Sequence, residues 1–372
     1  MLPGPTQLLA ALALLLLIGC RHTDPFGSAP QGTDQPFDPG PPARLTLNHG
    51  PDRGAAWLPD GSGILYSAQQ LGRSDHDVCL ALIPPSGGTQ RRLTCDLSPT
   101  GVDSTDAIET PAPLPDGRLA FVTAGSPVNA LTPGSAGIAL GSVTDPRTRT
   151  VLRALPYTIP GERLHSGASQ LRWLGQSRLV YLGERVEYRR TCPSCPQWDT
   201  LTMGLDVTLL DVGEPGALPR RVPGTDLASG VSAGSDEDEV YYTVAGDARV
   251  FRRALSTGVV SVAHDFGPAG IARDVHVVGS RMAAVVGGRV SFGTDPFSGP
   301  MQWDSGGTLH VVDFESGTDV VLGGPGLFRR PQISPARSAI VAEEYPLIIQ
   351  NVGGILDTTV SRRSDLYLFG QP

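Results

Sequence analysis

The stretch that decides the fold is Trp57–Tyr66, which reads WLPDGSGILY. Its centre, Pro59-Asp60-Gly61, is typical of a tight turn, because Pro presets φ, Asp bonds its own backbone and Gly accepts positive φ. The apolar run Ile64–Tyr66 is typical of a strand that is covered on both faces. The stretch therefore predicts a hairpin of two antiparallel strands.

This hairpin recurs along the chain. The clearest copy is Pro113–Phe121, which has the same Pro-Asp-Gly turn and an apolar strand after it. Four weaker copies keep the apolar pattern without the Pro-Asp pair: Trp173–Tyr181, Val231–Thr243, His276–Val285 and Ile333–Ala342. They begin about 45 to 60 residues apart, a period typical of propellers. Six such units predict an all-β fold, a six-bladed β-propeller.

Each blade is expected to have four strands. After the first hairpin, Asp77–Ile83 and Arg91–Thr94 flank a Gly-Gly turn and form a second hairpin. The last unit stops after Asp365–Phe369, one strand short, and Ala43–Leu47 resembles Arg91–Thr94. We therefore expect the N-terminal strand to complete the last blade, which removes the exposed edges of an open sheet.

The Trp-Leu-Pro-Asp-Gly core and the Gly-Gly…Arg-Leu-Thr ending resemble the TolB-type six-bladed propeller, over residues 43–372. The resemblance implies the fold of that family. The chain has no room for the small α/β domain that precedes the propeller in TolB itself, so the partners of TolB are not implied. Fold alone does not determine function.

Residues 1–19 resemble a bacterial lipoprotein signal peptide. The apolar run Leu8–Ile18 is too short for a membrane span and suits a signal sequence. It leads into Leu17-Ile18-Gly19-Cys20, which resembles a lipobox, so Cys20 is the expected lipid carrier. Because Met1–Gln7 contains no Arg or Lys, a plain secretory signal is the alternative.

Residues 20–42 are predicted to be the lipidated Cys20 and a flexible tether, since they are rich in Pro, Gly, Asp and Gln. The residue after Cys20 is Arg21 and not Asp, which by the same resemblance implies the outer membrane of a diderm cell. We therefore expect an exported lipoprotein of the bacterial cell envelope, facing the periplasm or the surface. The net charge of −8 argues against a nucleic-acid partner.

The four remaining cysteines fit an exported protein. Cys79 and Cys95 lie symmetrically about the Gly87 turn, so a disulfide between them is predicted, with two unpaired thiols as the alternative. For Cys192 and Cys195, in Cys-Pro-Ser-Cys, a disulfide that clamps a loop is favoured over a metal site or a redox dithiol.

No catalytic group, metal site or cofactor is predicted. Gly230–Gly234 matches the Gly-x-Ser-x-Gly pattern, but a strand follows it and not the helix that a nucleophile elbow requires. The acidic run Asp236–Glu239 lacks the alternating spacing of a calcium loop and reads as a solvated turn. The histidines of the predicted propeller are scattered among different repeats, and a metal site where they converge on the central channel is the alternative. They are His49, His76, His165, His264, His276 and His310.

The predicted function is therefore binding or docking, with another envelope protein as the expected partner. Trp198 and Trp303 lie in the long segments 188–201 and 292–303, so they are candidate contact residues, unless both rings pack under their own loops. The alternative is a propeller that uses its central channel as an enzyme site or to bind a carbohydrate or another small ligand. A channel lined by apolar and Arg side chains would count against the enzyme. A third possibility is that the propeller only supports assembly with copies of itself.

Overall fold

The computed structural model describes residues 40–370, without the segments 48–49, 70–77, 95–106, 125–136, 156, 159–163, 191–197, 215, 269, 288–289, 296–298, 304–306, 323–326, 353–354 and 362. The predicted signal peptide, Cys20 and nearly all of the tether lie outside this range. Regular structure in the described part consists of β-strands alone. A helix long and apolar enough to cross a membrane is therefore not found among these residues.

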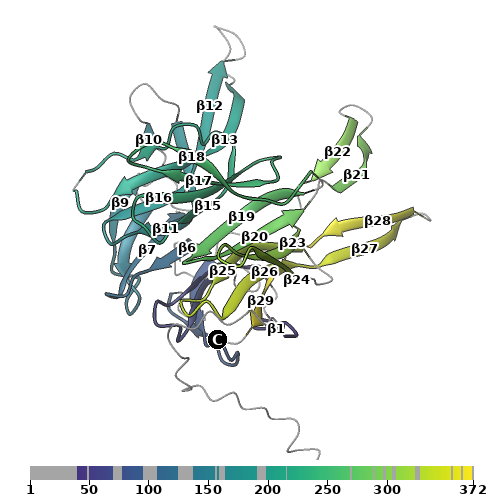
Figure 1. Cartoon of the computed structure of the whole chain (residues 1–372), viewed down its shortest axis with the longest axis horizontal. Helices are drawn as coiled ribbons and strands as arrows, with labels where there is room; N and C mark the ends of the chain where they lie inside the picture. Colours follow the sequence, from purple (N-terminus) through teal and green to yellow (C-terminus); the bar gives the residue numbers. More distant parts are fainter. Residues whose placement is uncertain are drawn as a thin grey trace, which may run out of the picture. The chain divides into compact units, whose positions relative to one another are not determined.

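The strands form six antiparallel sheets, blades 1 to 6, which follow one another along the chain (Figure 1). Blade 1 contains β2 (Asp52–Trp57), β3 (Ile64–Gln69), β4 (Val78–Ile83) and β5 (Arg91–Arg92). Blade 2 contains β6 (Ala107–Pro113), β7 (Arg118–Ala124), β8 (Gly137–Ser142) and β9 (Thr150–Ala154). Blade 3 contains β10 (Tyr157–Thr158), β11 (Leu164–Leu174), β12 (Arg178–Arg190), β13 (Trp198–Asp211) and β14 (Arg220–Arg221).

Blade 4 contains β15 (Ala228–Ala233), β16 (Glu239–Val244), β17 (Arg249–Ala254) and β18 (Val260–Asp265). Blade 5 contains β19 (Ile271–Val278), β20 (Arg281–Gly287), β23 (Thr308–Asp313) and β24 (Thr318–Leu322). Blade 6 contains β25 (Leu327–Ile333), β26 (Ala339–Tyr345), β29 (Asp365–Gly370) and β1 (Ala43–Arg44). The predicted all-β, six-bladed propeller is confirmed.

The first long strand of each blade lies at the centre of the ring. These first strands are β2, β6, β11, β15, β19 and β25. Each contacts the first strand of the next blade, and β25 contacts β2. Successive blades are therefore neighbours around the whole circle.

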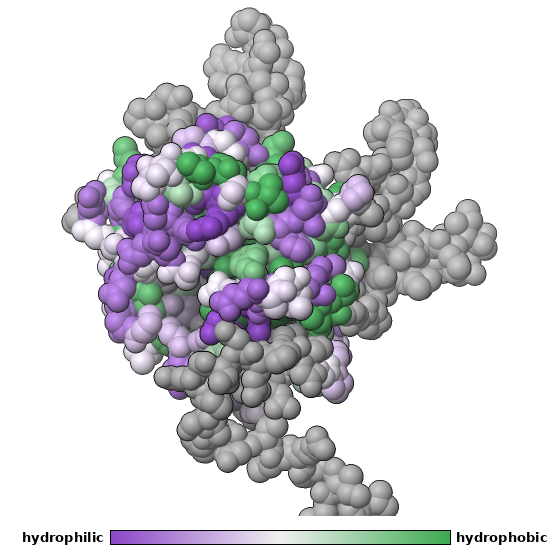
Figure 2. Space-filling view, in the orientation of Figure 1, coloured by the Kyte–Doolittle hydropathy of each residue, from purple (hydrophilic) through white to green (hydrophobic). Residues whose placement is uncertain are grey.

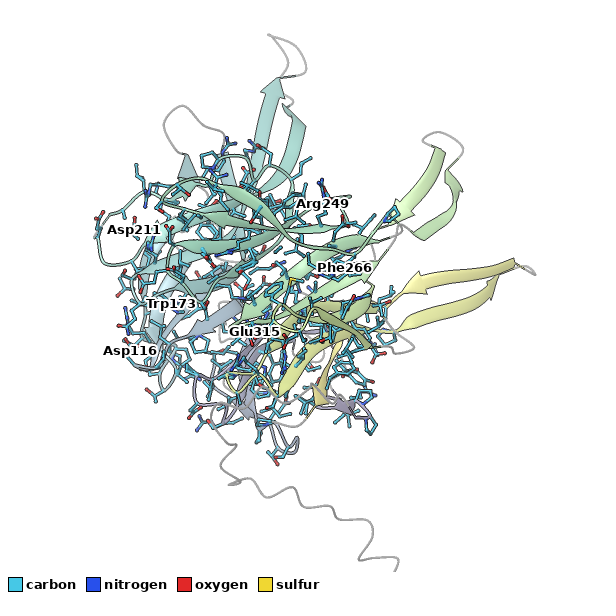
Figure 3. All side chains as sticks on the ribbon, viewed as in Figure 1. Asp116, Trp173, Asp211, Arg249, Phe266 and Glu315 are labelled. Atoms are coloured by element: carbon cyan, nitrogen blue, oxygen red, sulfur yellow. The ribbon has the colours of Figure 1, made fainter. Side chains whose placement is uncertain are left out.

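Apolar side chains fill the spaces between successive blades (Figure 3). There are six buried clusters in the described part, one for each pair of neighbouring blades. The run Ile64–Tyr66 shows how one strand contributes side chains to two of these clusters. Ile64 and Tyr66 face blade 6 while Leu65 faces blade 2, and all three are fully buried. This explains why the run has no polar alternation.

The turn between the first and second strands has the predicted chemistry. Gly61 has φ of +73°, and its N–H donates to the Leu58 carbonyl at 2.9 Å. The Asp60 carboxylate accepts the Ser62 N–H at 3.0 Å. In blade 2, Asp116 and Gly117 repeat these contacts with Arg118 and Leu114. Positive φ is retained at Gly175, Gly279 and Arg337 in the turns that lack Pro-Asp.

Every first strand carries an irregularity in its pairing with the second strand. In five blades a residue of positive φ lies within it: Gly54, Thr110, Gln170, Asp274 and Arg330. Blade 4 has a smaller shift, between Ala228 and Gly230. Such bulges re-aim side chains, and here they direct polar groups of several blades toward the centre.

Strand β1 occupies the fourth position of blade 6, where Ala43 and Arg44 pair with Leu368 and Tyr367 of β29. The chain continues this pairing without regular strand geometry. The Leu45 N–H donates to the Leu366 carbonyl at 2.8 Å, and the Leu366 N–H donates to Thr46 Oγ1 at 2.9 Å.

The same side-chain acceptor recurs in other blades. Thr94 Oγ1 accepts the Leu80 N–H in blade 1, and Thr225 Oγ1 accepts the Val207 N–H in blade 3. The Arg-Leu-Thr similarity between Ala43–Leu47 and Arg91–Thr94 therefore reflects one shared hydrogen bond.

Three hairpins extend the loops between second and third strands: the outer half of β12–β13, then β21–β22 (Val290–Asp295 and Gly299–Trp303), and β27–β28 (Leu347–Val352 and Ile355–Val360) (Figure 1). Because neighbouring strands are antiparallel, these hairpins leave the ring on the face opposite the turns that join first to second strands. The segments 188–201 and 292–303, predicted to be loops, are in part strands of these hairpins.

On the face shown in Figure 2, hydrophilic and hydrophobic residues are intermixed. Several apolar side chains that stay exposed belong to outer strands, such as Val260 and Val262 of β18 and Val321 of β24. One face of an outer strand meets solvent, so these exposed valines identify no particular binding surface.

Candidate functional site

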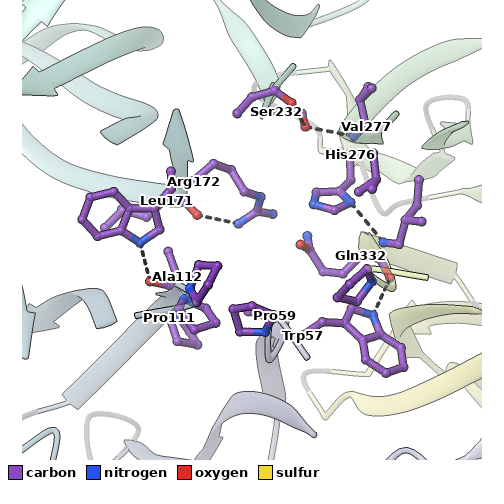
Figure 4. A pocket seen from close by; sticks show the side chains of 18 of the residues that line it. Trp57, Pro59, Pro111, Ala112, Leu171, Arg172, Ser232, His276, Val277 and Gln332 are labelled. Carbon is purple, nitrogen blue, oxygen red and sulfur yellow. Dashed lines mark hydrogen bonds between the residues drawn. The ribbon is translucent and has the colours of Figure 1, made fainter. Parts of the chain in front are cut away.

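A pocket of about 300 Å³ lies where the six first strands end (Figure 4). Each first strand contributes at least two residues to its wall, so all six blades meet there. We call this end of the central channel the channel mouth. It lies on the face opposite the three long hairpins.

The rim of the channel mouth is apolar, with five prolines and two tryptophans, Trp57 and Trp173. The indole N–H of Trp57 donates to the Gln332 carbonyl of blade 6 at 3.0 Å. The indole N–H of Trp173 donates to the Ala112 carbonyl of blade 2 at 2.7 Å, and the Arg118 guanidinium lies over its ring. Both rings therefore join one blade to the preceding one.

Similar hydrogen bonds join the other blades. They run from Ser67 Oγ to the Ile108 carbonyl, from the Val231 N–H to Gln170 Oε1, from the Val277 N–H to Ser232 Oγ, and from the Ile333 N–H to His276 Nδ1. Every neighbouring pair of blades is thus linked by at least one side chain. The bond between blades 1 and 2 lies at the start of β6, away from the mouth, whereas the other five bonds involve residues that line the mouth or lie next to its lining and hold it in shape.

Ser232, the serine of the Gly-x-Ser-x-Gly match, is one of these links. Its side chain accepts the Val277 N–H at 2.9 Å and donates to the Ala233 carbonyl at 3.0 Å. The residue is buried within β15 and no helix follows it. Its hydroxyl is occupied by structural contacts.

The channel below the mouth contains two buried carboxylates, each already paired. Asp274 accepts from Arg329 Nε, from the Arg330 N–H at 3.2 Å and from Gln170 Nε2 at 2.9 Å. Burial opposes its ionisation, but the charges of Arg329 and Arg330 hold the pKa of Asp274 below its ordinary value. Gln170 of blade 3 thus bonds Asp274 of blade 5 and also accepts the Val231 N–H of blade 4, the blade between them.

Glu343 of β26 is the second buried carboxylate. It accepts from Arg330 Nη1 at 3.1 and 3.2 Å, from the Gly54 N–H at 2.7 Å and from the Tyr345 hydroxyl at 2.8 Å. The charge of Glu343 raises the pKa of Arg330. Each carboxylate therefore has its own arginine partner.

Arg172 lines the channel mouth and has no such partner. Its only hydrogen bond within the described part of the chain runs from Nη1 to the Leu171 carbonyl at 2.7 Å. Its Nε is buried without an acceptor. Burial lowers the pKa of Arg172 to about 10, so the side chain stays charged at neutral pH.

His276 faces Arg172 across the pocket (Figure 4). Its Nδ1 accepts the Ile333 N–H at 3.0 Å, which places the proton of the neutral ring on Nε2. Burial and the nearby charge of Arg172 hold the pKa of His276 well below its ordinary value. His276 is therefore neutral, with Nε2–H available as a donor.

The site residues predicted from the sequence are not the ones that line the channel mouth. Cys20, Cys95, Cys192 and Cys195 lie outside the described residues, so the lipid anchor and both disulfides remain predictions. Cys79 is fully buried in β4. No group of three potential metal ligands occurs among the described residues.

The two candidate contact tryptophans lie in the long hairpins and not at the channel mouth. Trp198 begins β13 opposite Arg190, and Trp303 ends β22 opposite Val290. Sequence reasoning did not single out Arg172, and it considered His276 only as one of several scattered histidines. Their position in the repeat was the signal that could have identified them, because the residues just before the first turn of each repeat meet at the channel mouth.

No known family model matches the chain, and no curated protein matches it. Among solved structures, it is similar to a gluconolactonase from Xanthomonas campestris, with a TM-score of 0.54 and 16% identity over 90% of this chain and 91% of that chain. It is also similar to a putative TolB from Agrobacterium tumefaciens, with a TM-score of 0.48 and 12% identity over 88% of this chain and 93% of that chain. At such identities the likeness to the gluconolactonase structure concerns the fold alone and carries no ligand or reaction with it.

Proposed function

We propose that this protein is a binding module of the bacterial cell envelope that takes up its partner at the channel mouth. The observation that carries the proposal is a pocket built from all six blades, with an apolar rim and polar side chains that point inward. Ring-shaped convergence of this kind gives a rigid site, and rigidity reduces the entropy lost on binding.

The polar lining favours binding over carboxylate-based catalysis. Among the described lining residues the polar side chains are those of Arg172, Ser232, His276 and Gln332 and the two indole N–H groups, with no Asp or Glu. The carboxylates deeper in the channel, Asp274 and Glu343, are buried and bonded to arginines. Hydrolysis of a glycosidic bond ordinarily uses two accessible carboxyl groups, so this lining does not favour that reaction.

The cellular setting of the proposal rests on the sequence. A lipid on Cys20 and the tether that follows would hold the propeller near the membrane, with the channel mouth free to meet an envelope protein. The long hairpins, which include Trp198 and Trp303, would add contacts on the opposite face.

The test blocks the mouth without disturbing the ring. Pro335 is an exposed rim residue in a turn, so Pro335→Tyr places a large side chain at the opening, and Pro335→Ala is the matched small variant. Each full-length variant is crosslinked in native envelopes and purified by affinity. We expect one protein in near-equal amount with the unmodified chain and with Pro335→Ala, and its loss with Pro335→Tyr. Equal recovery with all three, or no partner from the correctly anchored chain, overturns the proposal.

A further inference from the structure

We propose that the channel mouth is a receptor for a carboxylate group, which the Arg172 guanidinium and the His276 Nε2–H bind from opposite walls. This inference rests on the proposed function, because it names the chemistry that the partner presents at the same site. The carboxylate can belong to a free organic acid or to a polypeptide.

The first argument is the charge balance of the channel. Asp274 is matched by Arg329, and Glu343 is matched by Arg330. Arg172 forms no ion pair within the described part of the chain, and its only acceptor is a neighbouring carbonyl. Asp274 acts on Arg172 only through its charge and is bonded to Arg329. A guanidinium without an ion pair at the wall of a pocket attracts a singly charged anion.

The second argument is that the opposite wall also offers a donor. The Ile333 N–H occupies Nδ1 of His276, so Nε2 carries the proton of the neutral ring. In Figure 4 the His276 ring and the Arg172 guanidinium point toward one another, and the Gln332 carboxamide points into the same space. A planar anion between them accepts from both walls, whereas a cation would meet a positive charge and an N–H group.

The third argument distinguishes a carboxylate from a phosphate. A phosphate dianion prefers two cationic partners, but Arg172 is the only arginine among the described residues that line the pocket, His276 is neutral, and Arg329 and Arg330 already bind carboxylates. The rim of prolines with Trp57 and Trp173 suits an apolar body attached to the charged group. An aromatic or aliphatic carboxylate therefore fits the site best.

The probe is phenylacetate, titrated by calorimetry into the purified full-length protein, with the uncharged amide phenylacetamide and inorganic phosphate as comparisons. Trp57 and Trp173 also provide a fluorescence signal at the rim. We expect phenylacetate to bind and the other two compounds to bind at least roughly tenfold more weakly, since a charge-assisted hydrogen bond is lost or mismatched. Equal binding of acid and amide overturns the proposal.

Arg172→Gln should weaken phenylacetate roughly tenfold or more, with Arg172→Lys less affected because it keeps the charge. The matched control is Arg220→Gln, which removes an exposed arginine of the same blade. Unchanged affinity in Arg172→Gln overturns the proposal.

Two substitutions of His276 test the roles of its two ring nitrogens separately. His276→Asn keeps an acceptor near the position of Nδ1 and removes the Nε2–H donor, while His276→Gln does the reverse. We expect His276→Asn to fold stably and bind phenylacetate weakly. We expect His276→Gln to lose stability and keep more of the affinity, and the opposite pattern contradicts the assigned roles.

A competition experiment identifies the source of the carboxylate. If phenylacetate added before crosslinking prevents recovery of the partner, and Arg172→Gln loses that partner, a polypeptide carboxylate enters the mouth. If phenylacetate binds but leaves the partner in place, the receptor serves a free acid. If Pro335→Tyr loses the partner but no carboxylate probe binds, the binding function stands and the carboxylate inference fails.

Discussion

Gly230 illustrates how single residues set the width of the channel. It lies in the first strand of blade 4, against the backbone of blade 5. A Cβ atom there would lie 2.5 Å from the Asp274 nitrogen and 2.8 Å from the Val275 nitrogen. The close approach of the two blades at this point therefore depends on a residue without a side chain.

We therefore expect Gly230→Ala to destabilise the protein by about 1–3 kcal/mol, because rigid backbone atoms cannot move aside. Urea denaturation measures the free energy of unfolding. Gly213→Ala is the control, since nothing lies within 4 Å of the added atom. Equal effects of the two substitutions would show that the close approach is unimportant.

The lowered pKa of His276 should make the stability of the protein depend on pH. Its pKa in the folded chain is far below the value of about 6.5 expected for the unfolded chain. Between these two values only the unfolded chain binds the proton, so the free energy of unfolding falls as pH falls below about 6.5.

The stability advantage of the unmodified chain over His276→Asn should therefore shrink between about pH 7 and pH 5, by at most about 1.4 kcal/mol per pH unit. Denaturation curves at several pH values measure it. His264→Asn is the control, because His264 is only partly buried and should give a smaller change. Parallel curves for His276→Asn and the unmodified chain would refute the assignment.

At the scale of elements, the fourth strands of blades 1, 3 and 6 end with the same kind of hydrogen bond. Thr46, Thr94 and Thr225 each use a side-chain oxygen to accept a backbone N–H of the neighbouring strand. The outer strands of these three blades, β1, β5 and β14, are only two residues long as regular structure, yet the pairing continues beyond them. In blade 6 this contact joins the first and last strands of the propeller.

We expect Thr46→Val to cost about 1–3 kcal/mol, because the Leu366 N–H loses its acceptor in a buried position. Thr46→Ser keeps the oxygen and should remain near the stability of the unmodified chain. Hydrogen exchange of the Leu366 amide reports the contact directly. If both substitutions leave that amide equally protected, the Thr46 bond does not contribute.

At the scale of the whole molecule, the propeller and the predicted membrane anchor belong to different segments of the chain. The propeller accounts for residues 43–370, and its candidate site is built from the first strands of the six blades. Membrane attachment depends on Cys20 alone if the lipobox is cleaved as predicted.

Cys20→Ala should then move the protein from the membrane fraction to the soluble fraction, or leave it unprocessed with its signal peptide. Fractionation followed by mass spectrometry of the N-terminal peptide measures both outcomes. Cys79→Ala is the control, since it changes a cysteine within the propeller and should leave the lipid in place. A lipid-free N-terminus in the unmodified chain would contradict the anchor.

The sequence by itself determined the repeating unit. Turn chemistry at Pro59–Gly61 and the apolar run Ile64–Tyr66 are local properties, and their recurrence predicts six blades without any knowledge of contacts. The missing last strand and its likeness to Ala43–Leu47 also follow from comparing segments of the chain with one another.

Only the tertiary structure decided the site. Arg172 and His276 are separated by two repeats and meet because closure of the ring brings the ends of all first strands together. The sequence contains 29 basic residues, and nothing local indicates that Arg172 is the one that lines the pocket without an ion pair among the described residues. That depends on bulges that place Asp274 and Glu343 beside Arg329 and Arg330, a balance of charges that exists only once the blades are packed.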